Sequence, residues 1–514
     1  MTTISPNPTS VARIAAREGV VQRRGRLALR NGTMGGSGLT PHEAMVCDLL
    51  FIRQVLDQHN IEFLLVRGND QRPVLAIDLS LRPRLEAALA AACAHEPLYA
   101  RSVDTKKSTV LVADGVLATS AQTRIVRLFR PRVETVGGLF YGAQWGVQLE
   151  FWEFTPAHIR LPVENSLTRR TVEHRDAARS SVELYGVSWP TIENMFIDHV
   201  FDVGFDIDMV FSWVDGSTAG YQEARSQLEE DAVLGEGDRH EARYRQIEEL
   251  RYALRSVHMF APWVRRIFIA TDSPAPAWLA EHPKVTLVRS KDHFADPSVL
   301  PTHNSMAVES QLHHIAGLSE HFLYSNDDMF FGRPVSPDLF FTAGGITRFV
   351  LSPTRIGLGE SEAARSGFEN SARVNRRLLW DRFGAFTTHH LEHNATPLRR
   401  SVLAELNGEF SAEFAATAAS TFRAAGNISV TNSLYHYYAL LTGRAVAHQD
   451  GRGIYVDTAA TSGLAELPRI LAQRNVDFIC LNDGSTGDAT AEQRRALVTD
   501  FLEKYFPFKA PWEK

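Results

Sequence analysis

Residues 321–332 read HFLYSNDDMFFG, an apolar run interrupted by adjacent acids, and this stretch decides how the rest of the chain is interpreted. Residues 322–324 are typical of a buried strand, and the apolar run resumes after Asp327 and Asp328. Adjacent carboxylates repel each other, and burying them costs several kcal/mol unless a cation compensates. The stretch therefore predicts either a cation site at a strand end or a turn in which Asp bonds to its own backbone.

Strand-like and helix-like segments alternate from residue 205 onward. The predicted strands are FDIDMVFSWVDG, VRRIFIATD, KVTLVRS and HFLYSNDD, and the predicted helices between them are IEELRYALRSVHMF and AVESQLHHIAGLS. This order predicts an α/β sheet of mostly parallel strands. Three of the strands stop at acids, namely Asp215, Asp272 and the pair Asp327–Asp328. Ligands of open α/β sheets bind beyond the carboxyl ends of strands, so we expect these acids to gather at one edge.

The remaining segments predict the domain organisation. Residues 1–40 lack periodicity and predict a flexible basic arm; residues 41–165 predict a small α+β domain, and residues 166–204 a polar connector. Residues 205–514 then form the third part, with a helical insertion at about 370–445. After it, strand-like segments return and the last one stops at Asn482-Asp483-Gly484.

Composition excludes several classes of protein. The 514 residues carry a net charge of −6, which argues against a strongly basic nucleic-acid binder. Cys47, Cys93 and Cys480 form no CxxC pair, which argues against a zinc ribbon or a disulfide scaffold and favours a reducing, cytoplasmic location. No apolar stretch reaches the ~18–20 residues that span a bilayer. Six arginines of the N-terminal arm leave peripheral contact with an anionic membrane surface as the alternative to a solvated tail.

Acids at strand ends also predict a chemistry. Oxygen ligands select hard cations such as Mg²⁺ or Mn²⁺, which typically take one or two carboxylates together with phosphate oxygens. The predicted edge is therefore suited to a nucleotide diphosphate held through a divalent metal ion.

Several long motifs resemble the conserved regions of the Stealth family of sugar-1-phosphate transferases, actinobacterial type. They are FDIDMVFSWVDGS, ELRYALRSVHMFAPWVRRIFIATD, LPTHNSMAVESQLHHIAGLSEHFLYSNDDMFFGRPVSP and FICLNDG. The resemblance covers residues 205–514 and is specific because the motifs are long and in order. It implies a Rossmann-like nucleotide-sugar-binding domain. It also implies transfer of a hexose-1-phosphate, such as N-acetylglucosamine-1-phosphate, from a UDP-sugar to an oligo- or polysaccharide hydroxyl, with release of UMP.

The resemblance also implies roles for particular residues. The implied catalytic residues are Glu309, Asp328, His393 and Arg423, with His389 and His390 as rivals of His393. Asp327, Asp328 and Asp483, the last following Asn482, would hold Mg²⁺ or Mn²⁺. The expected nucleotide-sugar contacts are Trp213, Asp215, Arg251, Arg255 and Asn326.

The hypothesis that follows is an in-line attack at phosphorus. His393 accepts the proton of the acceptor hydroxyl, while Arg423, with Arg251 or Arg255, offsets charge on the transferred phosphate. Two alternatives stay open: a metal-dependent glycosyltransferase that releases UDP, and a non-catalytic carbohydrate- or nucleotide-binding module.

Overall fold

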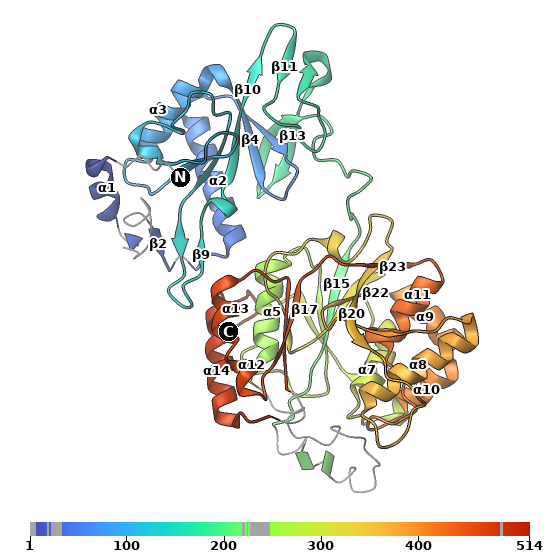
Figure 1. Ribbon diagram of the computed structural model, residues 1–514. Coiled ribbons are helices and arrows are strands. Elements are labelled where there is room, and N and C mark those ends of the chain that lie inside the picture. Colours follow the sequence, from blue (N-terminus) through green and yellow to red (C-terminus); the bar gives the residue numbers. More distant parts are fainter. Residues whose placement is uncertain are drawn as a thin grey trace. The chain divides into compact units, whose positions relative to one another are not determined.

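The computed structural model describes residues 7–17, 20–21, 33–36, 38–217, 222–223, 225–226, 247–483 and 487–514. The chain forms two compact units, Met1–Asp198 and His199–Lys514 (Figure 1). Each unit is described by itself.

A mixed eight-stranded sheet forms the centre of the first unit. Helices α2 (Pro41–Gln58) and α3 (Arg82–Ala92) share its main apolar core, in which Leu49, Leu89 and Leu149 are fully buried. The strands of this sheet are β3 (Leu64–Arg67), β4 (Pro73–Asp78), β5 (Tyr99–Ser102), β6 (Thr109–Leu111), β7 (Ile125–Phe129), β10 (Val147–Phe154), β11 (His158–Arg160) and β12 (Thr171–Glu173). A small second sheet comprises β1 (Val20–Val21), β2 (Thr33–Gly35), β8 (Arg132–Val133) and β9 (Phe140–Tyr141). The first unit therefore combines helices with a mixed sheet, which is the α+β arrangement that the sequence predicts.

The structure differs from the predicted arm where it describes those residues. Helix α1 (Pro8–Ala15) begins at a cap in which the Asn7 side chain accepts a hydrogen bond from the backbone of Thr9. Ile14 is buried against Tyr99 and Phe129, because the helix has one apolar face that the polar composition of the arm conceals. Most of the basic stretch, including Arg23, Arg24, Arg26 and Arg30, lies outside the described residues.

The predicted connector also contains regular structure. Strands β13 (Arg179–Leu184) and β14 (Val187–Ile192) form an antiparallel hairpin. Trp189 is fully buried in the main core, and its indole nitrogen donates a hydrogen bond of 2.8 Å to the carbonyl of Leu184. The ring of Trp189 anchors this otherwise polar segment to the main core. The segment therefore belongs to the first unit.

A five-stranded sheet of order β17-β16-β15-β18-β22 organises the second unit. Strands β15 (Ile207–Ser212), β16 (Ile267–Ala270), β17 (Val285–Val288) and β18 (His321–Asn326) are parallel, and β22 (Thr396–Arg399) is antiparallel to β18. The predicted α/β class and the mostly parallel sheet are confirmed. Ser212 and Asn326 are partners in the register, so the carboxyl ends of β15 and β18 lie side by side.

Asp327 and Asp328 form the two-residue turn between the central sheet and a second sheet. Strand β19 (Met329–Phe331) follows that turn and pairs with β25 (Phe478–Asn482), which in turn pairs with β24 (Gly453–Asp457). The strand that stops at Asn482 and Asp483 therefore belongs to this three-stranded sheet. A further three-stranded sheet contains β20 (Thr347–Arg355), β21 (His389–Leu391) and β23 (Ala445–His448).

Helices pack around these sheets (Figure 1). They are α5 (Glu249–Phe260), α6 (Ser290–His293), α7 (Ser305–Ser310), α8 (Gly367–Phe383), α9 (Arg400–Glu409), α10 (Ser411–Ala418), α11 (Tyr435–Leu441), α12 (Thr461–Leu464), α13 (Leu467–Gln473) and α14 (Ala491–Tyr505), with a π-helical turn, η9 (Val430–Leu434), before α11. The segment predicted as a helical insertion contains four of the helices but also β21 and β22. Because β22 completes the central sheet and Leu398 lies in its core, this segment is integral to the fold. Within the described residues, no helix has the length and apolarity needed to cross a membrane.

Candidate active site

Asp328 lies at the point where the two sheets meet. Its Oδ2 accepts a hydrogen bond of 3.2 Å from the side-chain amide of Asn482, which ends β25. The thiol of Cys480, on the same strand as Asn482, donates to the same oxygen at 4.0 Å. The other oxygen, Oδ1, is buried and has no hydrogen-bonding partner among the described residues.

The electrostatics of Asp328 follow from this placement. Burial raises the pKa of the carboxyl, and the nearby His393, Asn482 and Arg494 counteract only part of the rise. The charged form is therefore under-compensated by the protein alone. A cation at this carboxylate would supply the missing compensation.

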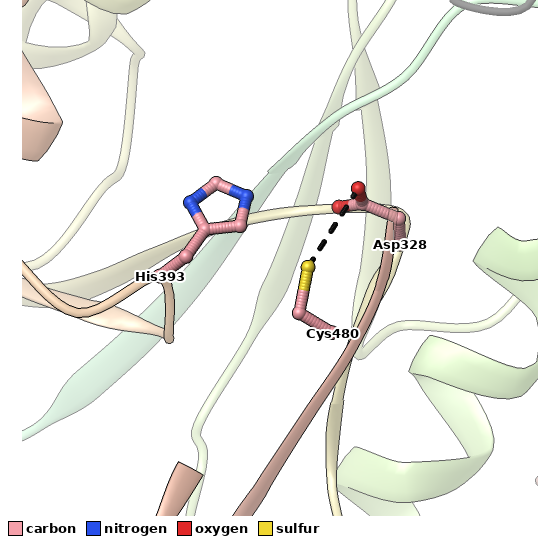
Figure 2. Close-up of side chains that lie close together, drawn as sticks. All are labelled: Asp328, His393 and Cys480. Atoms are coloured by element: carbon pink, nitrogen blue, oxygen red, sulfur yellow. Dashed lines mark hydrogen bonds between the residues drawn. The ribbon is translucent and has the colours of Figure 1, made fainter. Parts of the chain in front are cut away.

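His393 reaches the same place from the loop between β21 and β22. One ligand atom each of Asp328, His393 and Cys480 lie within 4.8 Å of one another, and the three residues could together hold a metal ion (Figure 2). Each comes from a different part of the chain, namely the β18–β19 turn, the β21–β22 loop and β25. The two rivals of His393 are engaged elsewhere: His389 is 3.1 Å from an Arg355 nitrogen, and His390 stacks on Phe368.

A second polar cluster lies around Glu309, at the carboxyl ends of β15 and β18. Glu309 of α7 is 4% exposed and accepts a hydrogen bond of 2.5 Å from the hydroxyl of Thr431 in the π-helical turn. The Tyr324 hydroxyl is 2.7 Å from Ser212 Oγ and 2.9 Å from Asn326 Oδ1. The cluster joins two adjacent strand ends to α7 and the turn before α11.

Burial and the neighbouring polar groups shift the pKa of Glu309 in opposite directions. Burial raises its pKa, while the Thr431 hydroxyl, the Arg423 charge, and the Tyr324 and Ser305 hydroxyls lower it in that order. Arg423 donates a hydrogen bond of 3.0 Å to Ser305 Oγ. The structure thus brings Glu309, Arg423 and Asn326 into one cluster, with Asp328 shortly beyond Asn326 in the chain.

Asp483 takes part in a buried ion-pair group. Arg494 of α14 is 3.2 Å from Asp483 and 3.7 Å from Glu249, at the start of α5. Burial raises the pKa of Glu249, and the nearby Asp328 raises it further. The three acids predicted to share a metal are therefore in different surroundings: Asp483 faces Arg494, while Asp327 and Asp328 form the turn.

Asp457 is a neighbour of this site that the sequence motifs did not indicate. It ends β24 and is the register partner of Asn482. Burial raises the pKa of Tyr455 to about 12, and Cys480, Asp457, Asp328 and Asp483 add to the rise because they lie near this ring. A signal was present in GIYVDT, a strand-like run that stops at an acid as the other predicted strands do.

Four predicted nucleotide-sugar contacts lie in other local networks. Arg251 and Arg255 both bind Glu513, at 2.8 and 2.7 Å. The Asp215 backbone donates to Ser273 Oγ, and the Asp215 carboxylate accepts from Ser217. The Trp213 backbone donates to the carbonyl of Ala270, which extends the pairing of β15 with β16. The two arginines are tied into the C-terminal segment, and the loop after β15 is held by its own turn.

The donor atoms around Asp328 can be tested against the predicted metal. Mg²⁺ and Mn²⁺ need few protein carboxylates when substrate phosphates and water complete the shell, so the unpartnered Oδ1 of Asp328 fits such an ion. The imidazole of His393 and the thiol of Cys480 are softer donors than Mg²⁺ prefers. The site fits a hard cation through Asp328 when phosphates are bound.

Comparisons with known proteins place these residues within matched regions. Three family models match the chain: Stealth protein CR2, conserved region 2, over residues 243–349; Stealth protein CR3, conserved region 3, over residues 392–440; and Stealth protein CR4, conserved region 4, over residues 468–514. Asp328, His393 and Cys480 fall in one matched region each. Glu309 lies in the first of these regions, and Arg423 and Thr431 lie in the second.

Two curated relatives are similar over nearly their whole length. The exopolysaccharide phosphotransferase CpsY of Mycobacterium tuberculosis (strain CDC 1551 / Oshkosh) is 58% identical over 496 residues, which cover 96% of this chain and 92% of that protein. An exopolysaccharide phosphotransferase of Nocardia farcinica is 52% identical over 483 residues, covering 94% and 90%. Among solved structures, the galactosyltransferase LgtC with donor and acceptor sugar analogs matches with a TM-score of 0.31 and 11% identity, over 59% of this chain and 97% of that one. That likeness is too slight to bear on fold or function.

Proposed function

The chain belongs to the Stealth family, and on that premise we propose that it transfers a hexose-1-phosphate from a UDP-sugar to a hydroxyl of an oligo- or polysaccharide. An acceptor oxygen attacks the phosphorus that carries the sugar. The bond from that phosphorus to the bridging oxygen breaks, UMP leaves, and a phosphodiester joins sugar and acceptor. The names of the relatives, exopolysaccharide phosphotransferases, support this class of reaction.

The observation that carries the proposal is the convergence of Asp328 and His393 beside the polar cluster of Glu309 and Arg423. The two clusters are linked through the end of β18, and together they offer a basic nitrogen, a cationic side chain and an under-compensated carboxylate. Phosphoryl transfer depends chiefly on positioning and on charge stabilisation, so this inventory is sufficient.

Each residue of the two clusters then acts through a particular group. A ring nitrogen of His393 accepts the proton of the attacking hydroxyl. The Arg423 guanidinium, held by Ser305, offsets negative charge on the transferred phosphate. Glu309 positions Arg423 and the Tyr324 hydroxyl rather than touching the substrate.

A divalent ion completes the proposal. Mg²⁺ or Mn²⁺, when bound, would be held by Asp328, with Asp327 and Asp483 as the other acids predicted to ligate it, and would neutralise the diphosphate of the donor. Asn482 keeps the Asp328 carboxylate in place through its hydrogen bond to Oδ2.

Phosphorus-31 NMR of the reaction tests this function. The protein is incubated with UDP-N-acetylglucosamine, Mg²⁺ and an exopolysaccharide acceptor, and we expect a phosphodiester signal and UMP. His393→Gln should slow UMP release by about 10²–10⁴-fold, the usual contribution of a general base. Asp328→Asn should also lose most of the activity. His390→Gln is the matched control, since His390 is stacked on Phe368 and should leave the rate unchanged.

The outcomes separate the alternatives. Free UDP without a phosphodiester would support a glycosyltransferase, and donor binding without turnover across a panel of UDP-sugars would support a binding module. If His393→Gln and Asp328→Asn remain folded and fully active, the assignment of the site is wrong. Thermal unfolding of each variant distinguishes lost chemistry from lost structure.

A further inference from the structure

We infer that Asp328, His393 and Cys480 form a site for a thiophilic divalent cation of the Zn²⁺ class, occupied without any nucleotide. The inference goes beyond the proposed reaction, in which Cys480 has no part. It concerns a second use of the same position, with a sulfur ligand that Mg²⁺ would not use.

The geometry of the three side chains carries this inference. Their ligand atoms are within 4.8 Å of one another, and Cys480 Sγ is 4.0 Å from Asp328 Oδ2 (Figure 2). Zn²⁺ bonds of ~2.0–2.3 Å in a tetrahedron place neighbouring ligand atoms about 3.5 Å apart. The distances between the three atoms would need to shorten by up to about 1.3 Å to reach that arrangement.

The supporting structure holds two of the three ligands firmly. Cys480 is 1% exposed in the middle of β25, and its register partner across the ladder is Met329, the residue after Asp328. The Asp328 carbonyl also accepts a backbone hydrogen bond of 2.9 Å from Leu481. The pairing of β19 with β25 therefore places the thiol beside the carboxylate, and His393 approaches them from a separate loop.

The chemistry of the donors selects the metal. A thiolate and an imidazole suit Zn²⁺ and Co²⁺, whereas Mg²⁺ and Ca²⁺ take oxygen ligands almost exclusively. With three protein ligands, the fourth position stays open to water, as in zinc sites that are not purely structural. Among the described residues Asp328 Oδ1 has no hydrogen-bonding partner, so this oxygen is available to coordinate an ion.

One consequence rests on the proposed function. An ion bound in this way takes the His393 nitrogen and an Asp328 oxygen that phosphate transfer would need. Zn²⁺ should therefore inhibit UMP release even when Mg²⁺ is in large excess, and removal of Cys480 should weaken that inhibition.

Co²⁺ spectroscopy of the 514-residue chain without nucleotide provides the test. We expect a thiolate-to-Co²⁺ charge-transfer band together with the visible bands of four-coordinate Co²⁺, and both should disappear on addition of Zn²⁺. Cys480→Ser should remove the charge-transfer band and weaken Zn²⁺ binding at least tenfold in competition with a chelating dye. Cys47→Ser, which changes an exposed thiol of the first unit, is the control and should alter neither quantity.

Two results would overturn the inference: Co²⁺ binding to the unaltered protein without a thiolate band, or a band that survives in Cys480→Ser. His393→Gln provides a second variant, which should keep the thiolate band but lower Zn²⁺ affinity. The readout uses no substrate, so failure of the phosphotransferase assay and failure of the metal site are distinguishable. Circular dichroism confirms that each variant is folded.

Discussion

At the scale of single residues, Glu309 is a buried carboxyl of the candidate site whose ionisation opposes folding. Its pKa is raised above the ordinary 4.5 because burial outweighs the hydrogen bonds and the Arg423 charge. A carboxyl with a raised pKa in the folded state stabilises the fold below pH 4.5, where both states are protonated. That contribution is lost as the pH rises through the raised pKa.

The stability of the Glu309→Gln variant, relative to that of the unaltered protein, should therefore depend on pH. Near pH 4 it should unfold at about the same temperature as the unaltered protein or somewhat below it. As the pH rises past 4.5, the difference in Tm should shift in favour of the variant, because the glutamine side chain carries no charge to bury. Differential scanning calorimetry between pH 4 and pH 8 measures this shift.

Glu405 is a control of opposite sign. Its pKa is lowered to about 2 by hydrogen bonds from Arg444 and Tyr438, and its side chain is exposed. Its contribution is present above pH 4.5 and is lost as the pH falls toward 2, so Glu405→Gln should lose stability at neutral pH and recover it in acid. If both variants change with pH in the same direction, the account of Glu309 is wrong.

At the scale of elements, the hairpin β13–β14 shows how one aromatic ring ties a polar segment to a core. Trp189→Ala should lower the free energy of unfolding of the first unit by ~3–5 kcal/mol, because the ring is fully buried and its indole hydrogen bond is lost. Urea unfolding of the full chain measures it. Trp380→Ala is the matched control, since Trp380 is 52% exposed and its removal should cost less than ~0.5 kcal/mol. Equal effects of the two variants would contradict this assignment.

Much of the second unit could be predicted at this scale. The segments from FDIDMVFSW to HFLYSN are apolar runs flanked by acids or turns, and they form the expected parallel strands. The membership of β25 in a separate sheet could not be predicted, because FICLN has the same pattern as a strand of the central sheet. Its place depends on pairing with β19, which lies far earlier in the chain, and periodicity carries no information on partners.

The same limit applies to the candidate site. Asp328, Glu309, His393 and Arg423 were predicted through the family motifs, whereas the position of Cys480 beside Asp328 depends on the β19–β25 register. Arg251 and Arg255 show the converse. The family resemblance implies nucleotide-sugar contacts for both, whereas the structure pairs both guanidinium groups with Glu513, which is distant in sequence.

At the scale of the whole molecule, the division into two units separates the candidate chemistry from the first unit. All residues assigned to the site lie within His199–Lys514. A protein consisting of residues 199–514 should therefore unfold in one cooperative step and release UMP at a rate within a few-fold of the full chain. The same shortened protein with Asp328→Asn is the control for background release. An insoluble or inactive product would show that the first unit supports folding or catalysis.

The π-helical turn Val430–Leu434 has a consequence for how the site is encoded. The backbone amide of Leu434 bonds to the carbonyl of Ser429, five residues back, so this turn holds one residue more than an α-helical turn. Each residue of a helix advances the side-chain direction by about 100°. Loss of a single residue here would therefore change which side chains on the two sides of the turn share a face. The hydrogen bond from Thr431 to Glu309 thus depends on the number of residues in this turn as well as on the threonine hydroxyl.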